Sequence, residues 1–183
     1  MKTKNRRELI ATVHILFGAL IALFLTASAP AEESVLLPAA SFDPPAPGPH
    51  DRCAVCGMFP AKYPKWAATI LFKDGHAEHF DGPKDLFKYM LGMERYAKGR
   101  VGEQIELVRV TDYYEVKRID ARSAFFVSGS DVLGPMGHEL VPLSERSAAE
   151  EFMRDHEGER IVAFDEVDAA LLLGLGGGKA GTP

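Results

Sequence analysis

The chain lacks the surplus of positive charge that nucleic-acid-binding proteins carry. Its 26 aspartates and glutamates outnumber its 21 lysines and arginines, which gives a formal net charge of −5 over 183 residues. Such an acidic chain has no electrostatic footprint for nucleic acid, so no partner of that kind is expected. Its surface is better suited to a basic or cationic partner.

Several motifs of common enzymes and cofactor proteins are also missing from the sequence. There is no Gly-x-Ser-x-Gly segment, which carries the nucleophile of many hydrolases. The glycine-rich residues 174–179 lack the Gly-Lys-Ser/Thr ending of a phosphate-binding loop. Gly57 follows the second of the two cysteines, where c-type haem attachment would need a histidine.

The first 31 residues have the layout of a bacterial export signal. Four basic residues in the first seven positions precede an apolar run from Leu9 to Leu25, and small residues follow at 27–31. We expect cleavage after residue 31. The alternative is an uncleaved membrane anchor, because the run reaches the lower length limit of a spanning helix. Both versions place the rest of the chain in the periplasm. Cleavage would change the net charge from −5 to −8, since the removed segment carries four basic residues and one acidic residue.

Composition divides the remaining chain into three segments. Residues 32–50 hold five prolines and few large apolar residues, which predicts an extended linker. Residues 51–168 are long enough to bury the core of a folded body. Residues 169–183 contain a glycine-rich stretch and are expected to form a flexible tail.

An internal repeat predicts that the folded body is an α+β protein of two tandem ββαβ units, 51–113 and 114–168. In the first unit, 66–72 and 76–80 have the composition of strands joined by an Asp-Gly turn. A helix is expected from Asp81-Gly82-Pro83 onward, with a polar residue to cap it. The alternating residues 105–111 predict the third strand.

The second unit repeats this pattern at an offset of 62 residues, so that Gly137-His138 matches Gly75-His76. Strands are expected at 121–127 and 161–164, and Ser144 is the expected cap of the intervening helix. The connection at residues 128–136 is longer than a hairpin needs, which indicates a functional loop.

Both cysteines of the chain lie in one short motif, Cys53-Ala-Val-Cys56-Gly-Met58. Three soft sulfur atoms therefore fall within six residues. Thiolates suit Cu(I) and zinc, and the neighbouring thioether favours copper. His76 and His79 face opposite sides of a predicted strand, and their spacing does not fit a Cys₂His₂ zinc site.

This motif and two others resemble the NosL family, the accessory copper chaperones of nitrous oxide reductase. The resemblance covers about residues 51–168, nearly the whole folded body. It implies a two-lobed periplasmic protein that binds Cu(I) and supplies it to nitrous oxide reductase in concert with the NosDFY transport complex, by delivery rather than enzymatic catalysis. The family is commonly lipidated at a cysteine, but this chain has no cysteine before Cys53, so any membrane tether would be its N-terminal helix. The motifs that carry the resemblance are 53–59, 120–137 and 162–167.

Five residues are the candidate metal ligands: Cys53, Cys56, Met58, Met136 and His138. The two cysteines carry the softest donors, and Met58 lies beside them in the chain. Met136 lies between Gly134-Pro135 and Gly137, a loop that could close onto a metal held elsewhere, and His138 is the best-placed histidine. The cysteine pair can hold copper within a monomer, or it can be shared between two chains around one metal. The alternatives are a small disulfide, which an oxidising compartment favours, a thiol–disulfide oxidoreductase, and another exported metal-binding protein.

Overall fold

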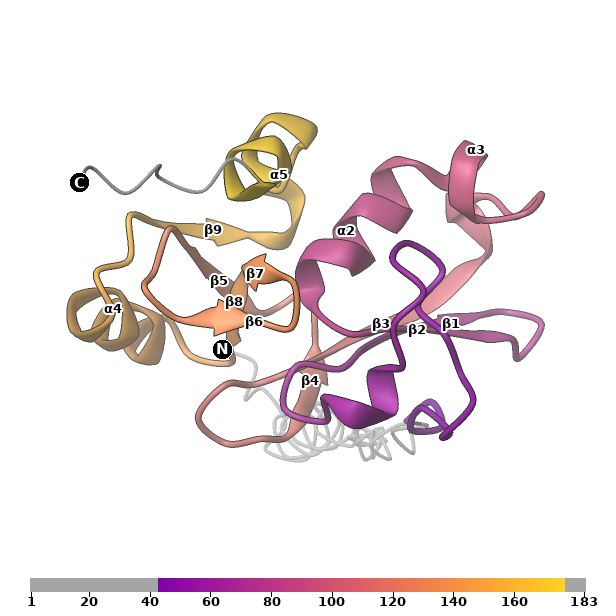
Figure 1. The fold of residues 1–183 in the computed structure, drawn as a ribbon, viewed down its shortest axis with the longest axis horizontal. Coiled ribbons are helices and arrows are strands. Elements are labelled where there is room, and N and C mark those ends of the chain that lie inside the picture. Colours follow the sequence, from indigo (N-terminus) through magenta and orange to yellow (C-terminus); the bar gives the residue numbers. More distant parts are fainter. Residues whose placement is uncertain (1–42, 177–183) are drawn as a thin grey trace, which may run out of the picture. The chain divides into compact units, whose positions relative to one another are not determined.

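Residues 43–176, the part of the chain that the computed structural model describes, form two larger antiparallel sheets, a two-stranded hairpin and the helices around them (Figure 1). This mixed α and β architecture agrees with the expected class at that level. The expected signal or anchor, residues 1–31, and most of the expected linker lie outside the described residues.

The strands are β1 (Ala68–Phe72), β2 (Ala77–Phe80), β3 (Ile105–Thr111), β4 (Arg118–Asp120), β5 (Phe125–Ser128), β6 (Leu133–Gly134), β7 (Gly137–His138), β8 (Val141–Leu143) and β9 (Arg160–Ala163). The helices are α2 (Pro83–Leu91), α3 (Met93–Tyr96), α4 (Arg146–Asp155) and α5 (Ala169–Gly176), with 3-10 turns η1 (Pro60–Lys62), η2 (Gly102–Gln104) and η3 (Phe164–Glu166).

The first sheet has the strand order β2-β1-β3-β4, and all its pairs are antiparallel. Every residue of β1 is buried, and α2 packs against β1 and β2. The Asp-Gly turn between these strands is confirmed: Gly75 has a φ of +84°, a conformation that glycine adopts without steric cost. The predicted strand at 105–111 is confirmed as β3, whereas β1 begins two residues later than predicted.

Helix α2 begins where the Gly82-Pro83 pair predicted, with Gly82 as the N-cap and Pro83 in the first turn. The expected polar cap was wrong, because no side chain of the N-cap residue bonds the helix start. The backbone N–H of Lys84 instead donates to the carboxylate of Glu139, 2.5 Å away and 55 residues further along the chain. Leu86 and Phe87 are buried in the main core, whereas Leu91, the last residue of the helix, is exposed.

The second sheet has the strand order β8-β5-β9 and carries α4 on one side. The expectation that Ser144 caps α4 was wrong: the N-cap is Glu145, and the N–H of Ser144 donates to Asp112 at 2.7 Å. Strand β5 begins at residue 125 rather than 121, because residues 121–123 form a turn in which Arg122 N–H bonds Asp120.

Three features differ from the boundaries drawn on the sequence. Strand β4 lies beyond residue 113 but pairs with β3, so the first sheet continues past the expected division. The long connection at 128–136 contains β6, which pairs with β7 in a small hairpin of residues 133–138. The expected flexible tail forms helix α5 in its first part, Ala169–Gly176. Leu172 and Leu175 are buried in the main core because residues three apart lie on the same side of a helix.

The described end of the expected linker, from residue 43 onward, is held to the first sheet by ion pairs and a hydrogen bond. Asp43 pairs with Arg109 and Arg118, and Arg118 also donates to the carbonyl of Pro44 at 2.7 Å. Residues 43–48 have no regular secondary structure, and residues 49–50 form a turn. Within residues 43–176 no helix has both the length and the apolar character needed to cross a bilayer.

Candidate metal centre

The two cysteines lie in a tight loop that the backbone closes on itself. The N–H of Cys53 donates to the carbonyl of Met58, and the N–H of Gly57 donates to the carbonyl of Cys53, each at 2.8 Å. Gly57 has a φ of +78°, which a residue with a side chain would adopt only with strain. The loop therefore presents both sulfur atoms from a fixed backbone.

The two thiols differ in exposure and both are free. Cys53 is buried in the main core, and Cys56 is half-buried at its edge. Because both thiols are free, Cys53 and Cys56 are not joined in a disulfide. The arrangement leaves Cys56 accessible to an incoming metal donor while Cys53 lies behind it.

Each thiol donates a hydrogen bond to an aspartate at the start of α2. Cys56 Sγ lies 3.1 Å from Asp81 Oδ1, and Cys53 Sγ lies 3.6 Å from Asp85 Oδ2. Asp81 and Asp85 are buried, and Lys88 Nζ donates to the other oxygen of Asp85 at 3.1 Å. The two carboxylates lie on the same side of the helix start because they are four residues apart.

One donor atom from each of Cys53, Cys56, Asp81 and Asp85 lies within 4.8 Å of the others. This four-residue group, the Cys₂Asp₂ cluster, has the size and composition to hold a metal ion. Sequence reasoning found the cysteines and missed the aspartates. A pair of acids four residues apart around a helix start was the available signal, but nothing in the sequence ties it to a motif 25 residues earlier.

Burial and the neighbouring carboxylates keep both thiols protonated. Burial raises the pKa of Cys53 to about 11. The pKa of Cys56 is also raised, first by burial and then by its hydrogen bonds to Asp81, Asp85 and Cys53. A metal that binds here must displace these protons.

Met58 is attached to the cluster through its backbone. Its carbonyl closes the cysteine loop, and its side chain is half-buried. The loop thus brings Met58 next to both cysteines, and its role as a ligand stays a prediction.

Met136 and His138 lie on the β6–β7 hairpin, away from the cysteines in sequence. Met136 is at the turn and 49% exposed. Lys84, one residue before Asp85, donates from Nζ to the carbonyls of Met136 and His138, at 2.9 and 2.5 Å. The hairpin is therefore joined to the same turn of α2 that supplies the carboxylates. Ligation by Met136 stays a prediction.

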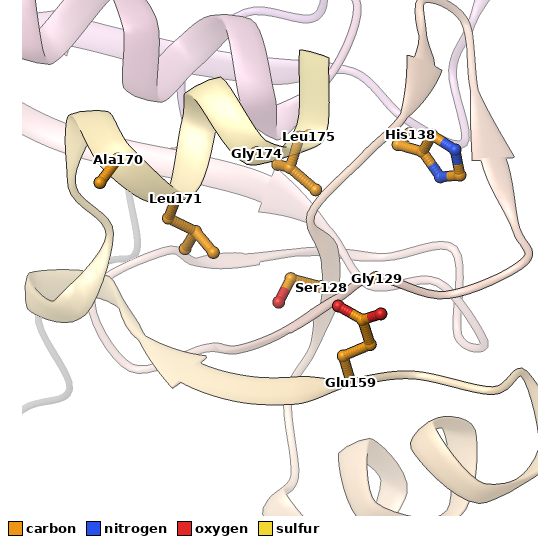
Figure 2. A pocket seen from close by; sticks show the side chains of 8 residues that line it. All are labelled: Ser128, Gly129, His138, Glu159, Ala170, Leu171, Gly174 and Leu175. Carbon is orange, nitrogen blue, oxygen red and sulfur yellow. The ribbon is translucent and has the colours of Figure 1, made fainter. Parts of the chain in front are cut away.

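The His138 side chain lines a separate cavity of about 280 Å³ (Figure 2). Ser128, Gly129 and Glu159 line the same cavity, together with residues of α5. His138 is not a member of the Cys₂Asp₂ cluster. Its role as a ligand also stays a prediction.

His76 and His79, at the β1–β2 hairpin of the first sheet, have partners of their own. His79 is buried, with Nδ1 3.0 Å from Thr69 Oγ1 and Nε2 3.6 Å from Asp51. Burial lowers the pKa of His79, so its ring favours the neutral form. His76 is exposed and pairs with Glu78, which agrees with the expectation that the two histidines do not share one site.

Comparison with known proteins places this geometry in a family. The chain is 31% identical over 137 residues to the copper-binding lipoprotein NosL of Stutzerimonas stutzeri, covering 72% of this chain and 70% of that protein. The crystal structure of the copper chaperone NosL from Shewanella denitrificans superposes with a TM-score of 0.60 at 28% identity, over 70% of this chain and 97% of the other. A model of NosL sequences matches residues 44–172, which span the cysteine loop, both larger sheets and the first half of α5. The chain therefore belongs to the NosL family.

Proposed function

We propose that this protein is a periplasmic Cu(I) carrier that supplies copper for the maturation of nitrous oxide reductase, working beside the NosDFY transport complex. The observation that carries the proposal is the pair of free thiols, Cys53 and Cys56, held together by one short loop. Two named relatives are copper-binding proteins, and thiolates are the protein donors that best suit Cu(I). The protein acts as a carrier, without a chemical step of its own.

Cys56 is the proposed entry point for copper because it is the more exposed thiol. A donor from the recipient can reach it there and replace one ligand at a time. Cys53, buried behind it, retains the metal until the exchange is complete. Such a half-open site suits delivery better than a closed cage does.

The third ligand in this proposal is a thioether. Met136 is exposed at the hairpin turn that Lys84 joins to the start of α2, and Met58 follows the cysteines directly. Asp81 and Asp85 are hard donors that Cu(I) does not favour. Their part is to accept the thiol protons' hydrogen bonds before loading. His138 is the remaining candidate ligand, and its place beside another cavity makes it the weaker one.

A zinc site is the second candidate, favoured by the two carboxylates of the Cys₂Asp₂ cluster. Zinc accepts thiolates and carboxylates in one tetrahedral set, and all four donors lie within 4.8 Å of one another. Competition between Cu(I) and Zn²⁺ for the same protein separates the two candidates. A copper carrier retains Cu(I) when equimolar Zn²⁺ is added.

Thiol–disulfide exchange is less well supported than metal binding. Redox-active cysteines have a lowered thiol pKa, whereas burial raises the pKa of Cys53 to about 11. The motif also lies in a loop before a 3-10 turn rather than at the start of an α-helix, whose N-terminus would stabilise a thiolate.

We further propose that the fold consists of two related ββαβ units. The order β8-β5-β9 in the second sheet corresponds to β2-β1-β3 in the first, with α2 and α4 following the second strand of each unit. Gly75 and Gly137, matched by the repeat, have φ values of +84° and +85°. The second unit then differs by a longer connection between its first two strands, residues 129–140, which contains the β6–β7 hairpin and Gly137.

The test of delivery is copper transfer to copper-free nitrous oxide reductase. The carrier, loaded with one Cu(I), is mixed anaerobically with the reductase, and copper is measured on both proteins after separation. Movement of copper to the reductase faster than from a small-molecule Cu(I) complex of equal affinity supports the proposal. Copper that stays on the carrier contradicts it.

A further inference from the structure

Two buried charged residues lie between the cysteine loop and the β6–β7 hairpin. Lys84 and Glu139 are each 3% exposed, although they come from different parts of the chain. Burial raises the pKa of the Glu139 carboxyl to about 8, and burying any ionisable group is costly unless it finds good hydrogen-bond partners. Their partners therefore indicate what the pair does.

Lys84 connects the start of α2 to the hairpin through three hydrogen bonds. Its backbone N–H donates to Glu139 Oε1 at 2.5 Å. Its Nζ donates to the carbonyls of Met136 and His138, at 2.9 and 2.5 Å. One carbonyl belongs to the hairpin turn and the other to β7, which follows it, so one ammonium group holds both.

Glu139 fills the base of the hairpin and leaves no space around its carboxylate. Oε1 also accepts the N–H of Leu140 at 2.9 Å. A Cβ at Gly82 would fall 2.4 Å from Oε2, and one at Gly134 would fall 3.0 Å from Cγ. Glycine at both positions allows the helix start and the hairpin strand to approach this side chain.

The same helix turn carries the carboxylates that bond the thiols. Asp85 follows Lys84 directly and accepts the hydrogen bond of Cys53, while Asp81 accepts that of Cys56. The turn thus contacts the cysteine loop through its aspartates and the hairpin through Lys84. A shift of the hairpin relative to this turn changes where Met136 stands with respect to both thiols.

We propose that Lys84 and Glu139 are positioning residues, which hold the hairpin so that Met136 can act together with the cysteine pair. This inference rests on the proposed copper function and adds residues that touch no metal. Buried charged side chains add little to stability over apolar residues of the same shape, even when their hydrogen bonds are satisfied. A positioning role explains better why Lys84 and Glu139 lie at the contact between the hairpin and the helix.

The first test measures the hairpin directly and needs no copper. In Lys84→Met the ammonium is lost, so we expect amide hydrogen exchange in residues 133–138 to rise at least about tenfold while exchange in β1 stays unchanged. Lys73→Met is the matched control, because Lys73 also donates from Nζ to a backbone carbonyl, at 2.7 Å, but far from the hairpin. Unchanged exchange in residues 133–138 overturns the proposal.

The second test asks whether Lys84 acts through Met136. Cu(I) affinity is measured for Lys84→Met, Met136→Ile and the double variant of the full chain. We expect Lys84→Met to weaken binding about tenfold alone and to have almost no further effect when Met136 is already replaced, because coupled residues are not additive. Additive losses overturn the positioning role.

A variant that fails to fold is replaced by Lys84→Gln, which removes the charge and shortens the reach by one atom but keeps a polar group. In this variant too we expect faster amide exchange in residues 133–138 and weaker Cu(I) binding that depends on Met136, but both changes should be smaller. If the unaltered protein binds no Cu(I) above a cysteine-free variant, the copper function fails. The exchange comparison then still decides whether the two residues fix the hairpin.

Discussion

Cys56 donates its thiol hydrogen bond to Asp81, 3.1 Å away, although the two residues are 25 positions apart in the chain. Cys53 and Asp85 form the matching contact. The start of α2 thus provides an acceptor for each sulfur, and both thiols stay protonated until a metal displaces the protons. Four consequences can be measured.

The first concerns Met136, which is exposed at the hairpin turn. Met136→Ile keeps the size of the side chain and removes the sulfur, so we expect Cu(I) affinity to fall about tenfold or more through loss of a soft ligand. Met93→Ile is the control, since Met93 packs against the main core. A competition titration measures both variants, and equal losses would remove Met136 from the site.

The second concerns pH. The pKa of Cys53 lies near 11 and that of Cys56 is also raised, so below these values both thiols carry a proton that Cu(I) must displace. Apparent affinity then increases with pH, by about tenfold per pH unit for each thiolate formed. Between pH 6 and 8 the slope of log K against pH approaches two, and it should approach one in Cys56→Ser. A slope near zero would mean that copper binds without the thiols.

The third concerns the close approach at Gly82, where an added Cβ would meet Glu139 at 2.4 Å. We expect Gly82→Ala to lower the free energy of unfolding by about 1–3 kcal/mol, the usual cost of overpacking. Gly102→Ala is the control, because nothing lies within 4 Å of a Cβ there. Denaturant unfolding monitored by circular dichroism compares the two. Equal stabilities would show that Glu139 moves aside freely.

The fourth concerns the alkylation of the metal-free thiols. Because their pKa values are raised, the thiolate fraction at neutral pH is small, and we expect iodoacetamide to react with Cys56 at least about tenfold more slowly than with an unperturbed cysteine. Asp81→Asn removes a neighbouring negative charge and should accelerate the reaction. Mass spectrometry of peptides quenched at intervals gives the rate. A fast reaction in the unaltered protein would instead support the oxidoreductase alternative.

Local patterns predicted the elements that local physics determines. The alternation of residues 105–111 is strand β3, and Gly82-Pro83 begins α2. The cysteine loop was found because it holds the only two cysteines of the chain. The glycine-rich end misled the prediction for residues 169–176, where Leu172 and Leu175 bury enough apolar surface to hold a helix on the core.

Contacts between distant residues could not be predicted from one sequence. In the sequence, Asp81 and Asp85 have the pattern of acidic residues that commonly stand at the start of a helix. Only the fold brings them close to the thiols. Strand β4 has two charged residues among its three, so its composition does not mark it as a strand. Lys84 and Glu139 are charged residues that a sequence places on the surface. Both are buried because Lys84 Nζ bonds two hairpin carbonyls and the Glu139 carboxylate accepts the backbone N–H groups of Lys84 and Leu140.

The central claim is that Cys53 and Cys56 hold Cu(I), and an anaerobic titration of the reduced protein with Cu(I) against a competing chelator tests it most directly. The account predicts one tightly bound Cu(I) per chain. It predicts that Cys56→Ser greatly weakens binding while the circular dichroism spectrum stays unchanged, and that replacing both cysteines abolishes it. Binding by the cysteine-free variant equal to that of the unaltered protein would contradict the account.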